Sequence, residues 1–91
     1  MKYSLAYAKV FAKEYKKLSP KNQELVDGVL EKLGNGETLE AKHKDHQLKG
    51  VLKDFRECHI KPDLLLVYAK QEDVLILTAL RVGSHSKLFK S

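Results

Sequence analysis

Three segments with the length and pattern of β-strands follow one another in the second half of the chain, with only short sequences between them. The segments are residues 54–60, 63–70 and 73–80, and they are joined through the sequences KPD and KQED. Connections this short join antiparallel strands, because a parallel crossover needs a dozen residues or more. The uninterrupted apolar run from Leu64 to Tyr68 indicates that the middle strand is covered on both faces. This part of the chain is therefore predicted to form an antiparallel meander.

The N-terminal part is predicted to form a strand and then a helix. Residues 2–7 alternate polar and apolar side chains, with Tyr3, Leu5 and Tyr7 on one side, which is typical of a half-buried strand. From residue 8 to residue 18 the apolar residues recur at helical spacing, and lysines occupy the other face. A strand followed by an amphipathic helix is therefore expected to open the fold.

A second helix and a long loop are predicted next. Ser19–Pro20 has the pattern of an N-cap followed by the first helical residue, and Gly34 with Gly36 is expected to end the helix in a left-handed conformation. Residues 36–53 show no sustained period, apart from a short strand expected around 46–48. The predicted fold is α+β in the order β-α-α followed by the meander, with the helix pair packed on one face of an antiparallel-rich sheet.

Composition and length set further limits. The 91 residues are expected to form one domain, residues 1–91. The only cysteine, Cys58, excludes an internal disulfide and is expected to be a small buried apolar residue. No apolar stretch suits a signal peptide or a membrane span, so a cytoplasmic protein without membrane contact is expected. A net charge of +5 is compatible with a polyanionic partner such as a nucleic acid.

All four histidines lie at or after position 43. His43, between two lysines, is expected to be exposed to solvent. His46 ends the long loop, His59 lies near the end of a strand, and His85 follows the last strand. His59 and Asp63 flank the same short turn, so their backbones should be close, and strand ends joined by tight turns lie along one edge of a sheet.

Strand parity assigns these side chains to faces of the sheet. Glu57 and His59 share one face of their strand, whereas Cys58 and Ile60 share the other. The helices should pack on the apolar face, which leaves Glu57 and His59 on the open face. Arg56 must then find an acidic partner or emerge at an edge. Histidine and carboxylate on an open face of a basic domain suggest a site for a phosphodiester.

Cleavage of RNA through its own 2′-hydroxyl would suit such a site. The reaction needs a base, an acid and cations that stabilise the phosphorane charge. Arg81 could clamp a phosphate, loop lysines such as Lys44 and Lys49 could hold flanking phosphates, and Phe89 could stack on an unpaired base. Gly83 would let the chain turn sharply off the last strand.

Each of these residues also has a structural interpretation. His46 could bond the loop backbone, Asp63 could be a turn residue, Arg81 could be an ion-pair partner and Phe89 could close over the core. The sequence HKDH also has a spacing that metal ligands use, but a structural zinc site usually adds cysteines, so no metal or other cofactor is expected.

Three motifs, KDHQLKG, FRECHIKPDLLLVYAK and LRVGSHSKLF, resemble the YafQ branch of the RelE/ParE toxin superfamily. The resemblance runs from His46 to Phe89 and implies the RelE-like fold. It also implies a metal-independent endoribonuclease that cuts mRNA, typically in the ribosomal A site, and that a cognate antitoxin silences. The matching catalytic positions are His46, His59, Asp63, His85 and Phe89. Substrate-binding positions are expected at Arg81, Glu57, Arg56, Lys44 and Lys49.

Two other classes of function remain open at this point. A ParE-like relative would share the fold and poison DNA gyrase, and a non-catalytic domain would bind RNA without cleaving it. A gyrase poison has no need of three histidines and an aspartate along one edge, which favours the nuclease. The expected partners are mRNA, the ribosome and an antitoxin protein.

Overall fold

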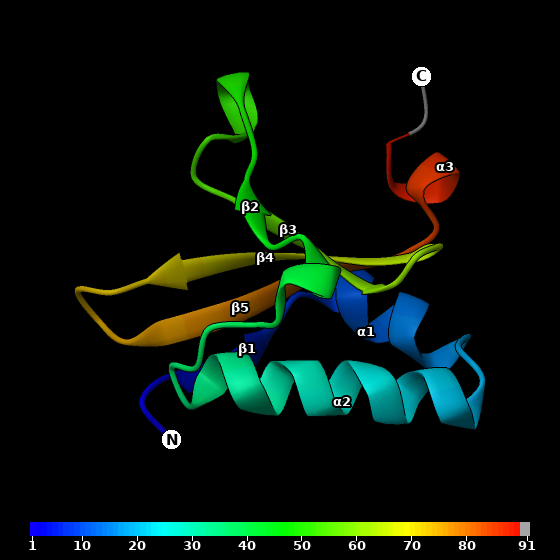
Figure 1. Cartoon of the computed structure of the whole chain (residues 1–91), viewed down its shortest axis with the longest axis horizontal. Coiled ribbons are helices and arrows are strands. Elements are labelled where there is room, and N and C mark those ends of the chain that lie inside the picture. Colours follow the sequence, from blue (N-terminus) through cyan, green and yellow to red (C-terminus); the bar gives the residue numbers. More distant parts are fainter. Residues whose placement is uncertain (90–91) are drawn as a thin grey trace.

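The computed structural model describes residues 1–89 and contains one five-stranded sheet in the order β1-β5-β4-β3-β2. The helices α1 and α2 lie on one side of this sheet, and α3 stands on the other side (Figure 1). The strands are β1 Ser4–Tyr7, β2 His46–Gln47, β3 Arg56–Lys61, β4 Leu64–Gln71 and β5 Ile76–Gly83. The helices are α1 Lys9–Lys16, α2 Pro20–Gly34 and α3 His85–Leu88, with the 3-10 turns η1 Ala41–His43 and η2 Gly50–Leu52. The predicted α+β order is confirmed.

The predicted start of α2 is confirmed, and its predicted end is partly wrong. The Ser19 hydroxyl accepts a hydrogen bond from the backbone N–H three residues later, at 3.2 Å, and Pro20 is the first helical residue. Gly36 has a left-handed φ of +81°. Gly34 instead remains helical, and a Cβ there would lie 2.9 Å from the Met1 sulfur. Side-chain packing, not backbone conformation, therefore favours glycine at position 34, and a Cβ there would displace the exposed Met1 side chain.

The N-terminal strand and helix differ from expectation at one aromatic side chain. Tyr3 is buried, but Tyr7 is 55% exposed, so the prediction that both lie on a buried side is wrong. Tyr7 is the last residue of an edge strand, and its ring stacks on Phe11 of α1 with centroids 5.8 Å apart. Phe11 is the residue of α1 that reaches the core.

The antiparallel meander of β3, β4 and β5 is confirmed, but the last strand lies further along the chain than predicted. Val74 and Leu75 occupy the preceding turn, where they are exposed and Leu75 has a φ of +55°. Because both residues are apolar, the sequence pattern wrongly placed them in the strand. The strand continues through Arg81 and Val82 to Gly83.

The N-terminal strand β1 completes the sheet by pairing in parallel with β5, from Ser4 opposite Ile76 to Tyr7 opposite Ala79. Both helices lie in the connection between these strands, as a parallel pairing requires. No feature of the sequence had indicated this pairing.

One cluster of buried side chains joins the two helices to the sheet. It includes Phe11, Val26 and Leu30 from the helices and Cys58 and Tyr68 from the strands. All five residues from 64 to 68 on β4 are buried, which confirms that the middle strand is covered on both faces. Cys58 is fully buried as expected, and burial raises the pKa of its thiol to about 12.

The chain leaves β5 without a glycine turn, so that expectation is wrong. Gly83 is not among the residues with positive φ. It is buried, and a Cβ there would lie 3.4 Å from the side chain of Leu88. Ser84 makes the turn by capping α3, where its hydroxyl accepts a hydrogen bond from the Lys87 N–H at 3.3 Å. Within residues 1–89 there is no helix with the length and apolar character needed to span a membrane.

Candidate active site

Strand pairing arranges His46, Glu57 and Arg81 in one row, which begins on the face opposite α2 and ends beside α1 at Arg81. His46 on β2 pairs with Glu57 on β3. Glu57 pairs with Val67 on β4, which in turn pairs with Arg81 on β5. Directly paired residues share a face, so these residues form one row across four strands. Three strand spacings give the row a length of about 14 Å.

The predicted parity of β3 is confirmed. Cys58 and Ile60 belong to the core beneath the sheet, and the alternate residues Glu57 and His59 point to the other face. Glu57 is nevertheless 7% exposed, because side chains around the row cover most of it. The carboxylate therefore lies at the bottom of the site.

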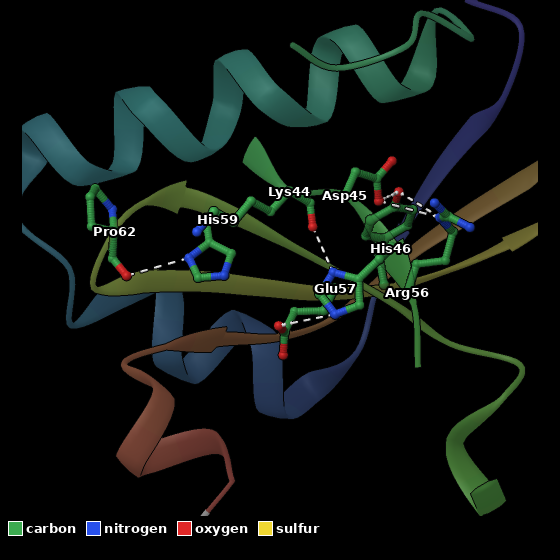
Figure 2. A network of polar contacts seen from close by, with 8 residues as sticks. Lys44, Asp45, His46, Arg56, Glu57, His59 and Pro62 are labelled. Atoms are coloured by element: carbon green, nitrogen blue, oxygen red, sulfur yellow. Dashed lines mark hydrogen bonds and ion pairs between the residues drawn. The ribbon is translucent and has the colours of Figure 1, made fainter. Parts of the chain in front are cut away.

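The imidazole of His46 is held in a fixed orientation above this carboxylate (Figure 2). Its Nδ1 lies 2.6 Å from the carbonyl oxygen of Lys44, a residue with a left-handed φ of +47°. Because a carbonyl only accepts, Nδ1 carries the proton in this bond. Nε2 then lies 3.6 Å from Glu57 Oε1, and half of the His46 side chain is exposed. Nε2 is thus the nitrogen available to a bound molecule.

Asp45 anchors the segment that carries His46. Its Oδ1 accepts a hydrogen bond of 2.6 Å from the hydroxyl of buried Tyr68, and Arg56 Nε lies 3.3 Å from the same oxygen. Burial, reinforced by the hydrogen bond to Asp45, raises the pKa of Tyr68 above its ordinary value. The hydroxyl therefore remains a donor, and the contact fixes Asp45 beside the end of β2.

Arg56 lies on the helix-covered face, whereas His46 and Glu57 lie on the other (Figure 2). The expectation that Arg56 needs an acidic partner is confirmed by its pairing with Asp45. The structure does not bring its guanidinium together with the row, although Arg56 was expected to bind substrate.

A second row lies next to the first. His59 pairs with Leu65, and Leu65 pairs with Gly83 at the end of β5. His59 Nδ1 is 3.4 Å from the carbonyl oxygen of Pro62, and the exposed Asp63 follows in the same turn. His59 and Asp63 therefore lie at the end of the sheet from which α3 begins, as the edge argument predicted.

His43 is buried, so the prediction that it is exposed to solvent is wrong. Its Nδ1 lies 2.6 Å from the carbonyl oxygen of His59. At η1 the loop after α2 packs against β3, and this contact buries the His43 side chain. His43 thus supports the backbone of His59 from the side of the core.

The short helix α3 brings His85 and Phe89 to the same face as the rows. The two rings lean on each other with centroids 5.3 Å apart and planes at 40°. His85 is exposed and Phe89 is half-buried. Phe89 lies outside the main core cluster and lines an apolar groove with Val67 and Leu88 on this face of the sheet.

Arg81, at the other end of the first row, forms an ion pair with Glu14 of α1. Its Nη2 is 2.7 Å from Glu14 Oε2, and its Nε is 3.1 Å from both carboxylate oxygens. Glu14 Oε1 also accepts the backbone N–H of Val82 at 3.1 Å. Burial alone would raise the pKa of Glu14, but these hydrogen bonds outweigh it and lower the pKa below its ordinary value. The structural interpretation of Arg81 as an ion-pair partner is therefore correct.

The remaining predicted residues are cations on the surface. Lys44 and Lys49 are exposed on either side of β2. Among residues 1–89, no group of three histidine, cysteine or carboxylate side chains is arranged to hold a metal ion. The candidate site therefore combines histidines, one buried carboxylate and lysines, which suits proton transfer beside an anionic ligand.

The sequence profile of one protein family, described as the bacterial toxin of type II toxin–antitoxin systems, YafQ, matches residues 3–90. This chain belongs to the YafQ family. All the residues of both rows lie inside the matched region. The resemblance of the three C-terminal motifs is thereby confirmed at the level of the family.

Solved structures of YafQ-type toxins have the same fold. A metal-bound toxin from Helicobacter pylori is 43% identical, with a TM-score of 0.83 over 96% of this chain and 99% of that one. YafQ in the DinJ–YafQ toxin–antitoxin complex of Escherichia coli is 27% identical, with a TM-score of 0.83 over 98% and 99%. The fold is therefore that of the YafQ toxins along nearly the whole chain.

A curated relative, the mRNA interferase toxin YafQ of Escherichia coli K12, is 37% identical over 57 residues. The alignment covers 63% of this chain and 60% of that protein. The chain thus matches less than two thirds of the length of this curated YafQ relative.

Sequence reasoning about the YafQ motifs missed four residues that shape the site. Asp45 and Tyr68 fix the His46 segment, His43 supports His59, and Glu14 engages Arg81. The need of Arg56 for an acidic partner was a usable signal for Asp45. Glu14 and Arg81 are 67 positions apart, and nothing local in the sequence connects them.

Proposed function

We propose that this chain is an endoribonuclease that cleaves mRNA at the face carrying His46, Glu57, His59 and His85. Membership of the YafQ family supports this, as does the name mRNA interferase toxin carried by the curated Escherichia coli relative. The observation that carries the proposal is the half-exposed imidazole of His46, held with Nε2 over the buried carboxylate of Glu57. A fixed imidazole beside a carboxylate suits proton transfer at neutral pH.

The proposed reaction uses the 2′-hydroxyl of the RNA as the nucleophile. A base on the protein takes the 2′-hydroxyl proton, the 2′-oxygen attacks phosphorus, and the bond to the 5′-oxygen breaks. An acid returns a proton to that oxygen, so that a 2′,3′-cyclic phosphate and a 5′-hydroxyl result. The imidazoles of His46, His59 and His85 are the proton carriers in this scheme, with Asp63 beside His59. Phe89 holds a base near His85 by stacking.

Cations would stabilise the phosphorane charge. Lys44 and Lys49 are exposed and can reach flanking phosphates. Arg81 uses Nε and Nη2 on Glu14, which leaves its Nη1 donors for a phosphate oxygen. We assign Arg56 an indirect role, because its guanidinium is held by Asp45 and Tyr68 on the opposite face.

The proposed partners are a cognate antitoxin protein and the ribosome, and the proposed location is the cytoplasm, where mRNA is translated. The antitoxin is supported by the Escherichia coli relative, which has been solved in a complex with DinJ. The ribosome is proposed because the resemblance to the toxin superfamily implies cleavage in the ribosomal A site. The proposed chemistry uses only side chains, so it needs no metal ion.

Primer extension on a defined mRNA in a reconstituted translation reaction tests the proposal. The wild type is compared with His85→Ala and with a matched control, Ser86→Ala, which alters an exposed neighbour on the same helix. New 5′ ends are expected with the wild type and with Ser86→Ala, and not with His85→Ala. Circular dichroism should show the same fold for all three proteins.

Two additional conditions test the remaining parts of the proposal. Omitting ribosomes shows whether the ribosome is needed, and EDTA shows whether metal is needed. Cleavage that persists in EDTA is expected. No cleavage by the wild type with or without ribosomes would refute the nuclease, and full activity of His85→Ala would refute the proposed site.

A further inference from the structure

An apolar groove of about 340 Å³ lies on the face that carries the candidate site. One wall comes from the connection around η2 and contains Leu48, Leu52 and Phe55, and another comes from α3 and contains Leu88 and Phe89. Leu80 of β5 and two residues at the start of α1, Ala8 and Val10, complete the lining. Val67 lies between the walls, in the same row as Glu57 and Arg81. Figure 1 shows the η2 connection and α3 standing on the same side of the sheet. The groove therefore continues the candidate site towards Arg81.

Backbone hydrogen bonds within the connection around η2 hold this wall of the groove in place. The Leu48 N–H donates to the Phe55 carbonyl at 2.9 Å, and the Phe55 N–H donates to the Leu52 carbonyl at 2.9 Å. These bonds close the connection into a compact projection whose tip, Val51, is 97% exposed. Phe55 is thus held in place at the base of the projection, half-buried and in reach of a ligand in the groove.

The surroundings of the groove favour an anionic chain that carries flat apolar groups. Arg81 lines the groove, and although its Nε and Nη2 bind Glu14, its Nη1 donors are not used in that ion pair. No carboxylate lines the groove itself. Lys49 directly precedes η2, and Lys87 lies on α3, and both are exposed. Phosphates attract such cations, and nucleobases stack on aromatic side chains. A volume of 340 Å³ is at the lower end of small-molecule pockets and suits one base and part of its sugar, not a helix.

We propose that this groove binds an unpaired nucleobase of single-stranded RNA next to the scissile phosphate, with Phe55 as the stacking residue. The inference rests on the proposed function and adds a base subsite to it. Phe55 is then a binding residue outside the set of histidines, and the base it holds fixes the register of the RNA on the row of His46 and Glu57.

A binding measurement without cleavage tests the subsite. The probe is a short fluorescein-labelled RNA with 2′-O-methyl groups, which cannot be cleaved, and fluorescence anisotropy gives its Kd at low salt. A set of such RNAs carries one abasic residue at each position in turn. The variants are Phe55→Ala, Phe55→Leu, which keeps apolar packing without an aromatic face, and Phe55→Tyr. Val51→Ala is the matched control on the exposed tip of the same wall.

One abasic position is expected to weaken binding to the wild type about tenfold, which corresponds to about 1.4 kcal/mol and lies within the range for stacking of one base. Phe55→Leu should bind the intact RNA about tenfold more weakly than the wild type does. Its affinity should not fall further when the RNA carries the abasic residue at that position. Phe55→Tyr and Val51→Ala should behave like the wild type. Because Phe55→Leu conserves apolar character, it tests the subsite even if Phe55→Ala does not fold.

Three results would overturn the subsite. The first is that the abasic residue weakens binding equally in the wild type and in Phe55→Leu. The second is that Phe55→Leu binds the intact RNA as tightly as the wild type. The third is that the wild type shows no detectable RNA binding in the absence of ribosomes. In each case the groove would belong to another occupant, such as an apolar side chain of a protein partner. Cleavage of mRNA by the wild type in the translation reaction would still support the nuclease, so the two proposals fail separately.

Discussion

Removing the Glu14 carboxylate is expected to destabilise the fold more than removing any exposed carboxylate of the chain. Only 10% of the Glu14 side chain is exposed, and it binds both Arg81 and the backbone N–H of Val82. The pair joins α1 to β5, where the ladder shifts register beside residue 81. Glu14→Ala therefore removes a connection between a helix and the centre of the sheet.

The magnitude follows from the two bonds that are lost. A hydrogen bond to a charged group contributes about 1.5–3 kcal/mol, and we take the lower end because 38% of the Arg81 side chain is exposed. A buried N–H left without an acceptor, here that of Val82, costs about 1–3 kcal/mol. Glu14→Ala should thus lower the free energy of unfolding by about 3 kcal/mol, or the Tm by about 12 °C or more. Glu14→Gln keeps an acceptor for the Val82 N–H and should lower the free energy of unfolding by about 1.5 kcal/mol.

Urea denaturation followed by circular dichroism measures these differences, with Glu24→Gln as the exposed control. The pKa of Glu14 is lowered in the folded state from an ordinary 4.5. A group with a lowered folded pKa contributes stability that is fully present above its unfolded pKa and is lost as the pH falls through the folded value. The stability difference between wild type and Glu14→Gln should therefore be constant near neutral pH and shrink in acid below pH 4.5.

Two results would contradict this reasoning. If Glu14→Ala lowers the free energy of unfolding by less than about 1 kcal/mol at pH 7, water replaces the bonds of Glu14 to Arg81 and to the Val82 N–H at little cost. A difference between wild type and Glu14→Gln that stays constant into strong acid would mean that charge is not what stabilises the pair.

Three further predictions concern single residues. Cys58 should not react with a thiol reagent at pH 8 in the native state and should react on unfolding in urea, because burial raises its pKa to about 12; rapid native labelling would contradict its burial. Gly28→Ala should stabilise the protein by about 0.5–1 kcal/mol in the same denaturation assay, since it lies inside α2 and a Cβ there meets nothing within 4 Å; a loss of stability would mean that the helix needs glycine for another reason. Gly36→Ala should destabilise it by about 1–2 kcal/mol because φ is +81°, and an unchanged midpoint would mean that the turn can relax.

Features of the fold that depend on neighbouring residues could be predicted from the sequence. The period of two along β3 was enough to separate Glu57 and His59 from Cys58 and Ile60. The same argument predicted that Arg56 either has an acidic partner or emerges at an edge, and the structure shows Asp45 as its partner. Turn and cap residues were equally informative where they act locally, as at Ser19.

Features that depend on contacts distant in sequence could not be predicted. Val74 and Leu75 are as apolar as the strand that follows, and only the pairing of β4 with β5 decides that they form the turn. The burial of His43 depends on where the loop after α2 crosses β3, which its lysine neighbours do not indicate. The engagement of Arg81 by Glu14 depends on the packing of α1 beside β5.

The parallel pairing of β1 with β5 has a consequence for how the protein is made. Within residues 1–89, β1 pairs with β5 alone, so this sheet cannot close until the segment through β5 has emerged from the ribosome. Closing a loop of that length adds an entropic cost and slows folding compared with local pairing. Until then, β1 and the apolar side of α1 have no sheet to cover them, and His85 and Phe89 have not yet joined His46 and His59. A nascent chain from which β5 and α3 have not yet emerged therefore cannot assemble the candidate site.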